Sequence, residues 1–409
     1  SGFVQAQMSQ QLPDELRLHF SCFPYRSLAR KWIVMLFMGT CFLYCARMAM
    51  PVCAVSMAAT FHWSKIDSGL VLGGFFWGYC LTQILGGHAS DRVGGERVLF
   101  FSASSWALIT AGTPLLAHLG SHTLALMTVA RFLMGISQGV FFPSLASLCS
   151  QRVVEGERGF LMSTLQSGTH LGTLLAGGLG TLMLDRYGWE SMFYSIGFLS
   201  GLWALIVWQC LLKVYVLGEL TPKVMETKKN SEWSLSRIPW LSLFKKPPVW
   251  AMVFAHMCMC STSYTLLSWL PTYFKESFPH ATGWVYNVVP WLTAIPSALV
   301  GGYVSDFLIN RGYGVASVRK IMQVSVRAGV SVNVQDLTPS CAGALFGEFL
   351  WFLGVVLVSL SGYLIEVTQS WSVVFALITL VNATGLGVFL IFGGARRVDL
   401  VEYSRIIEI

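Results

Sequence analysis

The stretch GGHASDRVGGERV, from Gly86 to Val98, is a short polar connection between two segments that are long and apolar enough to cross a lipid bilayer. Gly94 and Gly95 supply the backbone freedom that a tight turn needs. Asp91 and Arg92 place two opposite charges at the end of the preceding helix. The stretch therefore predicts two adjacent membrane-spanning helices joined by a very short loop.

A related pattern returns later in the chain as GGYVSDFLINRGY, from Gly301 to Tyr313. It again follows an apolar segment, and Asp306 again stands five residues after the first glycine. Two such copies indicate an internal repeat, and repeated membrane bundles hold their site between them, near the middle of the bilayer.

The composition is that of a membrane protein with many spans. Hydrophobic residues make up 54% of the chain and charged residues 11%, and the mean hydropathy is +0.61. The sequence predicts an all-α polytopic protein with ten full spans, and only the stretch 310–340 does not fit as a span. The expected spans are 33–57, 68–89, 98–118, 122–149, 159–184, 192–213, 249–274, 284–309, 341–365 and 371–393.

Most of the 27 Lys and Arg residues fall on one side of these spans. This bias predicts that both termini and the Asp91 turn lie in the cytosol. Attraction to anionic lipid accounts for the net charge of +7 without nucleic acid. The expected parts are a cytosolic tail (1–31), a six-helix bundle (32–213), a cytosolic linker (214–247), a second bundle incomplete around 310–340 (248–394) and a cytosolic tail (395–409).

The ten cysteines are scattered singly, which predicts neither disulfides nor a metal site. The chain begins at Ser1, which indicates a fragment or an imprecise start, with Met8 as a candidate initiator. Metalloprotease, nucleophile-elbow and Walker-type motifs are absent from the sequence. An enzyme is therefore not expected, and uphill transport would have to be secondary.

Two arginines, Arg47 and Arg131, lie deep inside apolar spans. An arginine at such depth costs roughly 2.5 to 3.5 kcal/mol, so each should face a partner or a wet cavity. The first half of the chain offers no Asp or Glu within a span to neutralise them. Both are therefore candidates for binding an anion, and the alternatives are a structural ion pair or a side chain that reaches the membrane surface.

The span around Arg131 also contains Gly135, Gly139 and Pro143 at four-residue spacing, a pattern that permits close helix contact and a kink. Gln138 either donates to a phosphate or carboxylate or is a satisfied packing amide. Four aromatic residues are candidates for stacking on a base or ring, with packing as the alternative for each. They are Tyr79, Tyr264, Trp269 and Trp291.

The first copy of the repeat resembles the loop motif G-x-x-x-D-R-x-G-G-[RK] of major facilitator superfamily transporters. Gly87, Asp91, Arg92, Gly94 and Gly95 match it, and the second copy lacks the arginine after its aspartate. The resemblance implies two pseudo-repeated helical bundles that rock about a central site. It also implies a conformational gating motif, made of Gly87, Asp91, Arg92, Gly95 and Asp306.

Longer strings, among them FFWGYCLTQILGG (75–87), ARFLMGISQGVFFP (130–143) and SWLPTYF (268–274), resemble the solute carrier 17 family of organic anion transporters. LYCARMAMPVC, LTPSCAGALFG and FGGARRVDL are most similar to its nucleotide carriers. Leu72 and Gln138 stand where glutamate carriers of the family have His and Glu, which argues against glutamate. The resemblance implies substrate binding by Arg47 and Arg131, and the candidate set is Arg47, Arg131, Gln138 and Tyr79.

The same resemblance implies a monomeric transporter that loads nucleotides such as ATP, ADP and GTP into secretory or synaptic vesicles or lysosomes. The membrane potential would drive it, chloride would activate it, and no cofactor is expected. The alternatives are another anion carrier, for phosphate, sialic acid or glutamate, or a non-transporting truncated form. The last follows from the apparent loss of the ninth span and the front of the tenth, with a join around 323–329.

Overall fold

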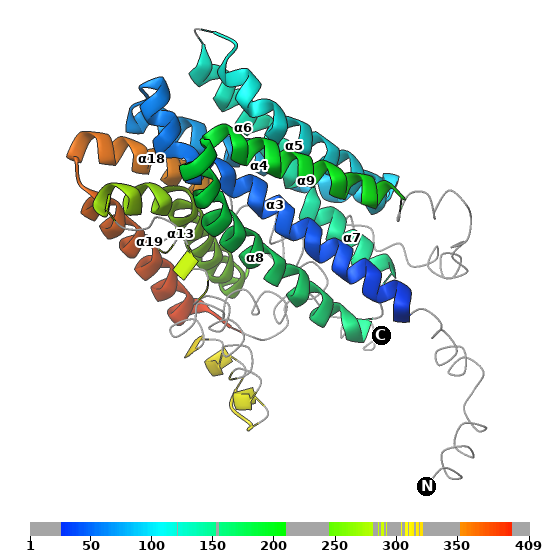
Figure 1. Cartoon of the computed structure of the whole chain (residues 1–409). Coiled ribbons are helices and arrows are strands. Elements are labelled where there is room, and N and C mark those ends of the chain that lie inside the picture. The colour runs from blue at the N-terminus through cyan, green and yellow to red at the C-terminus, as the bar shows by residue number, and fades with distance from the viewer. Residues whose placement is uncertain are drawn as a thin grey trace, which may run out of the picture.

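The computed structural model describes residues 26–209 apart from 121, 153 and 154, residues 245–280 and 352–394, and short pieces between 285 and 321. Every long element in these parts is a helix (Figure 1). The helices are α3 (Arg26–Phe61), α4 (Lys65–Val93), α5 (Gly95–Ala117), α6 (Thr123–Gly139), α7 (Phe141–Arg152), α8 (Glu155–Tyr187), α9 (Trp189–Val207), α13 (Pro247–Ser277), α18 (Phe352–Thr368) and α19 (Trp371–Phe392).

The chain runs back and forth between two ends of this bundle. At the end that we call the α3–α4 end, α3 stops at Phe61 and α4 starts at Lys65. Ser64 caps α4 there, because its Oγ accepts from the backbone N–H of Asp67 at 3.1 Å while Asp67 Oδ2 accepts from the Ser64 N–H at 3.0 Å. At the opposite end, which we call the Gly94 end, α4 turns into α5.

The described helices group into two sets. In the first set, α3 packs on α8, α4 on α6 and α5 on α9; in the second, α13 packs on α18 and α19. Figure 1 shows the second set beside the first, with α18 close to α4. We call the two sets the N bundle (α3 to α9) and the C bundle (α13, α18 and α19).

The stretch 86–98 is almost entirely helical, so the predicted loop was too long. Only Gly94 lies outside a helix, with φ at 98°, a value that favours glycine. Gly95 is needed for space instead, because a Cβ there would lie 2.8 Å from the Ser144 carbonyl oxygen of α7. Asp91 and Arg92 stand in the last turn of α4.

The predicted span 122–149 is divided into α6 and α7 at Val140. Pro143 explains the break, because it has no N–H for the Gly139 carbonyl and its ring crowds the same group. Among the described residues, five helical segments are long and apolar enough to cross a membrane, which is fewer than the ten spans expected; one of the five, Thr123–Leu145, runs through this break. Asp306, Trp291 and most of residues 310–340 lie outside the described residues, so ten spans stay a prediction.

Glycines bring α4 and α6 into close contact. A Cβ at Gly135 would collide with the Phe75 carbonyl oxygen, and one at Gly78 would collide with the Phe132 carbonyl oxygen. Both obstacles are backbone atoms, which cannot swing away as a side chain can. The contact fixes where the side chains of α4 stand relative to those of α6.

Gly135→Ala is therefore expected to destabilise the protein by roughly 1 to 3 kcal/mol through overpacking. The melting temperature of the purified protein in detergent should fall by several degrees. Gly112→Ala in α5 is the matched control, since a Cβ there meets nothing within 4 Å. Equal melting temperatures for the two variants would contradict the proposed α4–α6 contact.

Candidate functional site

Arg47 of α3 and Arg131 of α6 come together in the core of the N bundle. Their exposed fractions are 1% and 4%. The Phe75 ring of α4 joins them, because its centroid lies 4.8 Å from Arg47 Cζ and 4.9 Å from Arg131 Cζ. Arg47 also lies over the rings of Tyr44 and Tyr79, at 4.5 and 4.8 Å. Aromatic faces attract both guanidinium groups by cation–π interaction.

Local features of the sequence position these groups. Pro51, one turn after Arg47 in α3, has no N–H for the Arg47 carbonyl, so the regular helical hydrogen bonding is interrupted beside the site. Phe75 and Tyr79 are four residues apart on α4 and therefore share one face. The glycine contact between α4 and α6 holds that face against Arg131.

Gln138 orients Arg47. Its Oε1 accepts a hydrogen bond from Arg47 Nε at 3.3 Å, and its Nε2 donates to the Leu43 carbonyl oxygen at 3.2 Å. The side chain is fully buried. The protein therefore satisfies this amide, in agreement with the packing alternative, and Gln138 holds the Arg47 guanidinium in place.

The two guanidinium groups retain hydrogen-bonding capacity. Nη1 and Nη2 of Arg47 and Nε of Arg131 are buried without a hydrogen-bond partner among the described residues. Nη1 of Arg131 donates only to the thioether sulfur of Met134, at 3.4 Å, which is a weak acceptor. In the described parts of the chain, no carboxylate forms an ion pair with either arginine. The arrangement is therefore suited to a multiply charged anion with several oxygen acceptors.

The other candidate residues have different surroundings. Tyr264 of α13 is buried and packs on Phe76, with ring centroids 4.8 Å apart. Phe76 is the residue that follows Phe75 of the arginine site. Trp269 Nε1 donates to the Val358 carbonyl oxygen at 2.9 Å, which favours its packing role. Gly95 begins α5. The structure describes only the backbone of Gly87, Asp91 and Arg92, and Asp306 and Trp291 lie wholly outside the described residues.

Phe75 and Tyr44 complete the site, although the sequence did not single them out. The signal that could have identified them is helical spacing, since Phe75 precedes Tyr79 by four residues and Tyr44 precedes Arg47 by three. Aromatic residues are abundant in membrane spans, so spacing alone selects too many candidates.

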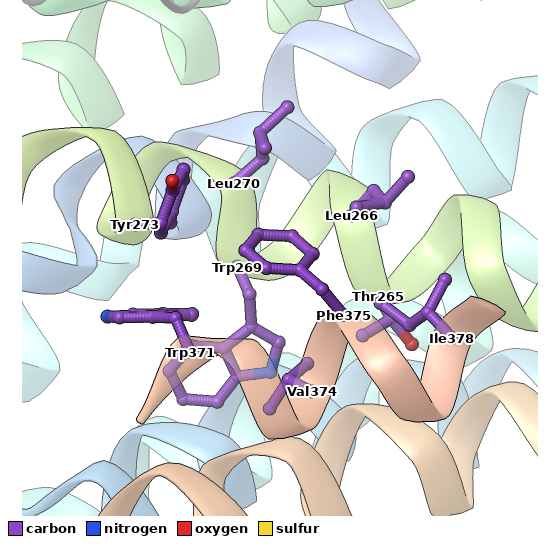
Figure 2. A pocket seen from close by; sticks show the side chains of 9 residues that line it. All are labelled: Thr265, Leu266, Trp269, Leu270, Tyr273, Trp371, Val374, Phe375 and Ile378. Atoms are coloured by element: carbon purple, nitrogen blue, oxygen red, sulfur yellow. The ribbon is translucent and has the colours of Figure 1, made fainter. Parts of the chain in front are cut away.

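A separate apolar pocket lies between α13 and α19 (Figure 2). Trp269, Tyr273, Trp371 and Phe375 contribute aromatic walls to it. It contains no charged side chain and does not include the arginines. Its chemistry does not suit an anion. Within the described residues, no three His, Cys, Asp or Glu side chains come together as metal ligands would.

Comparison with known proteins gives a consistent result. The family model of the Major Facilitator Superfamily matches residues 35–325. The voltage-gated purine nucleotide uniporter SLC17A9 of Mus musculus is 47% identical, over 97% of this chain and 98% of its own length. That of Homo sapiens is also 47% identical, over 92% of this chain and 94% of its own length.

The alignment with the mouse protein extends over 443 positions, more than the 409 residues of this chain, so the relative contains residues without a counterpart here. Among solved structures, a D-xylose-proton symporter superposes with a TM-score of 0.63 at 15% identity. The match covers 89% of this chain and 97% of the symporter. At that identity the likeness concerns the fold alone.

Proposed function

Because this chain belongs to the Major Facilitator Superfamily, in its solute carrier 17 family, we propose that it carries purine nucleotides across a membrane as a uniporter driven by the membrane potential. It is a transporter and not an enzyme. The observation that carries the proposal is the pair of buried arginines, whose free guanidinium N–H groups face no carboxylate among the described residues.

The roles of the site residues follow from their contacts. Arg47 and Arg131 bind the phosphate oxygens of the nucleotide, because planar guanidinium groups donate to such oxygens in pairs. Tyr79 and Phe75 hold the arginines through their rings, and Gln138 fixes the orientation of Arg47. These assignments make Gln138 a positioning residue, whereas the two arginines contact the substrate.

The membrane potential is a sufficient driving force. Moving one elementary charge through 100 mV is worth about 2.3 kcal/mol, so a nucleotide with roughly four negative charges gains about 9 kcal/mol. A potential that is positive on the far side would therefore concentrate the nucleotide strongly. The mechanism needs neither a proton site nor a sodium site.

The cellular setting is also part of the proposal. The excess of Lys and Arg on one side supports cytosolic termini and a cytosolic Gly94 end. Family resemblance supports secretory vesicles or lysosomes as the location, chloride as an activator and a monomer as the working unit. Uptake would then run from the cytosol into the vesicle.

The second candidate function is that of a non-transporting truncated form. It is favoured by the residues of the mouse relative that have no counterpart in this chain. The fold and the arginine site would persist in such a form, but the C bundle would lack a pair of helices. Nucleotide binding would remain while uptake is lost.

Proteoliposomes with an imposed potential, positive inside, test both candidates. We expect labelled ATP to accumulate and the accumulation to vanish when the potential is collapsed. Uptake of phosphate, sialic acid or glutamate without ATP would contradict the nucleotide assignment. Nucleotide binding without any uptake would favour the truncated form.

Asp91→Asn tests the gating motif at the end of α4. We expect neutralisation to change the maximal rate of uptake more than the apparent affinity, because the charge would act on the conformational step rather than on binding. Initial rates across a range of ATP concentrations measure both quantities. Equal loss of rate and affinity would indicate that the charge serves topology or folding instead.

A further inference from the structure

A stripe of residues along α4 holds the two bundles together at the α3–α4 end. Lys65, Gly69, Gly73 and Phe76 follow each other at intervals of four or three residues and therefore share one helical face. This face meets α18 and α13 of the C bundle. The stripe extends over about 16 Å of helix.

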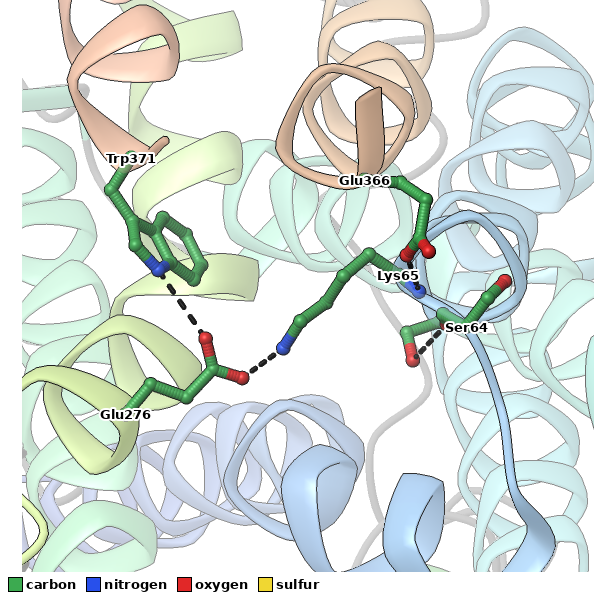
Figure 3. Close-up of polar contacts among 6 residues, drawn as sticks. Ser64, Lys65, Glu276, Glu366 and Trp371 are labelled. Atoms are coloured by element: carbon green, nitrogen blue, oxygen red, sulfur yellow. Dashed lines mark hydrogen bonds and ion pairs between the residues drawn. The ribbon is translucent and has the colours of Figure 1, made fainter. Parts of the chain in front are cut away.

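The outer part of the stripe is a polar cluster (Figure 3). Lys65 Nζ forms an ion pair with Glu276 of α13, and the second carboxylate oxygen of Glu276 accepts from Trp371 Nε1 of α19 at 3.3 Å. The backbone N–H of Lys65 donates to Glu366 Oε2 of α18 at 2.8 Å. One residue of the N bundle thus contacts two carboxylates of the C bundle, through its side chain and its main chain.

The middle of the stripe is a glycine contact. A Cβ at Gly69 would lie 3.2 Å from the Cα atom of Gly362 in α18, and a Cβ at Gly362 would lie 2.5 Å from the Lys65 carbonyl oxygen. A Cβ at Gly73 would collide with the hydroxyl of Ser359. The two helix backbones therefore touch, and little space is left between them.

The inner part of the stripe reaches the arginine site. Phe76 packs on Tyr264 of α13, and the neighbouring Phe75 lies between the two arginines. Polar cluster, glycine contact and aromatic pair therefore form a continuous line of contacts from the α3–α4 end to the arginine site. The described residues show the two bundles joined along this half of the molecule.

We propose that Lys65, Glu276 and Glu366 form the gate at this end, and that release of their contacts lets the bundles separate and opens the arginine site toward the α3–α4 end. The glycines make closure possible, because they let α4 and α18 meet without side chains between them. The polar cluster stabilises closure, because it satisfies the N–H of Lys65 and three charges at once. The three charged residues position the bundles and do not contact the substrate.

This inference rests on the proposed transport function, but its test does not require transport. Cysteines replace Ile66 and Tyr363, which are 44% and 51% exposed beside the glycine contact. A short bifunctional thiol reagent is added to the purified protein. Mass spectrometry then quantifies the peptide that links these two positions, so the native cysteines can stay in place.

Lys65→Glu should lower the yield of this cross-link about threefold or more, because it replaces the attraction between Lys65 and Glu276 by repulsion between two carboxylates. The double variant Lys65→Glu with Glu276→Lys should restore most of the yield. Lys275→Glu is the matched control, since it reverses a charge on the neighbouring residue and should leave the yield unchanged. The melting temperature of each variant shows whether a lower yield comes from opening of the gate or from loss of folded structure.

A second cysteine pair within the N bundle, at the exposed positions Leu108 and Phe198, should give the same yield in every variant. The gate is refuted if Lys65→Glu leaves the Ile66–Tyr363 yield unchanged, or if the charge exchange fails to restore it. The gate would also be refuted if the melting temperature falls in parallel with the yield, because the polar cluster would then only stabilise the folded protein. Absence of ATP uptake with the predicted cross-links would instead count against the proposed function alone.

Discussion

Replacing Arg131 by alanine is expected to abolish nucleotide uptake while the protein still inserts and folds. Arg131 is buried beside Phe75, and its guanidinium has only a thioether as acceptor among the described residues. Loss of a buried charged contact costs roughly 2 to 5 kcal/mol, which corresponds to a fall of about 30-fold or more. Removing an unpaired charge from the membrane interior should not harm insertion.

Uptake is measured in proteoliposomes, and binding is measured by the rise in melting temperature that ATP produces. Arg131→Lys keeps the charge but loses the planar fork, so we expect at most partial recovery. Arg186→Ala is the control, because Arg186 is an exposed residue in the last turn of α8. Arg47→Ala should behave as Arg131→Ala does. Uptake at the unmodified rate in Arg131→Ala would remove this residue from the site.

If the chain is the truncated form, its uptake lies near background, and inserting the hairpin is expected to raise transport at least tenfold. The insertion would be placed between residues 323 and 329, where the sequence predicts the join, and would carry residues of the mouse relative that have no counterpart here. Two absent helices would leave neighbouring faces in the C bundle without their partners, and loss of packed apolar surface weakens a bundle. The same measurements of uptake and melting temperature apply.

An insertion of equal length made of Gly and Ser is the control, because it lengthens the chain without supplying apolar faces. It should not raise uptake. Robust potential-driven ATP uptake by the 409-residue chain itself would exclude the truncated form and would mean that a further hairpin is dispensable. The C-terminus should stay on the same side of the membrane in both variants, because a hairpin adds two crossings and a Gly/Ser insertion adds none.

The sequence predicted the helical class and singled out Arg47 and Arg131, because apolar length and unpaired charge are local properties. It placed the turn at Gly94 correctly but made it too long, since the polar residues before it belong to the last turn of α4. The break at Val140 follows from Pro143, although the sequence predicted only a kink. Each difference concerns how backbone hydrogen bonds are completed at a helix end.

The contacts between the bundles could not be predicted in this way. No sequence pattern singled out Lys65, whereas in the structure its N–H donates to Glu366, 301 residues away. Phe75 was one aromatic residue among 27 phenylalanines. Pairing of distant residues depends on how the two halves of the repeat face each other, and no local pattern encodes that arrangement.

Helix α4 carries glycines on two faces. The contact that one face makes is permanent, and the contact that the other makes breaks when the bundles separate. Gly78 faces α6 within one bundle, whereas Gly73 faces α18 across the boundary that we propose to open. Replacing glycine by a larger residue would therefore have different phenotypes at these two positions, although they are only a few residues apart. At Gly78 it would reduce the amount of protein in the cell. At Gly73 it would leave abundance intact and bias the resting carrier toward the opposite orientation, which matters when inherited variants in this helix are interpreted.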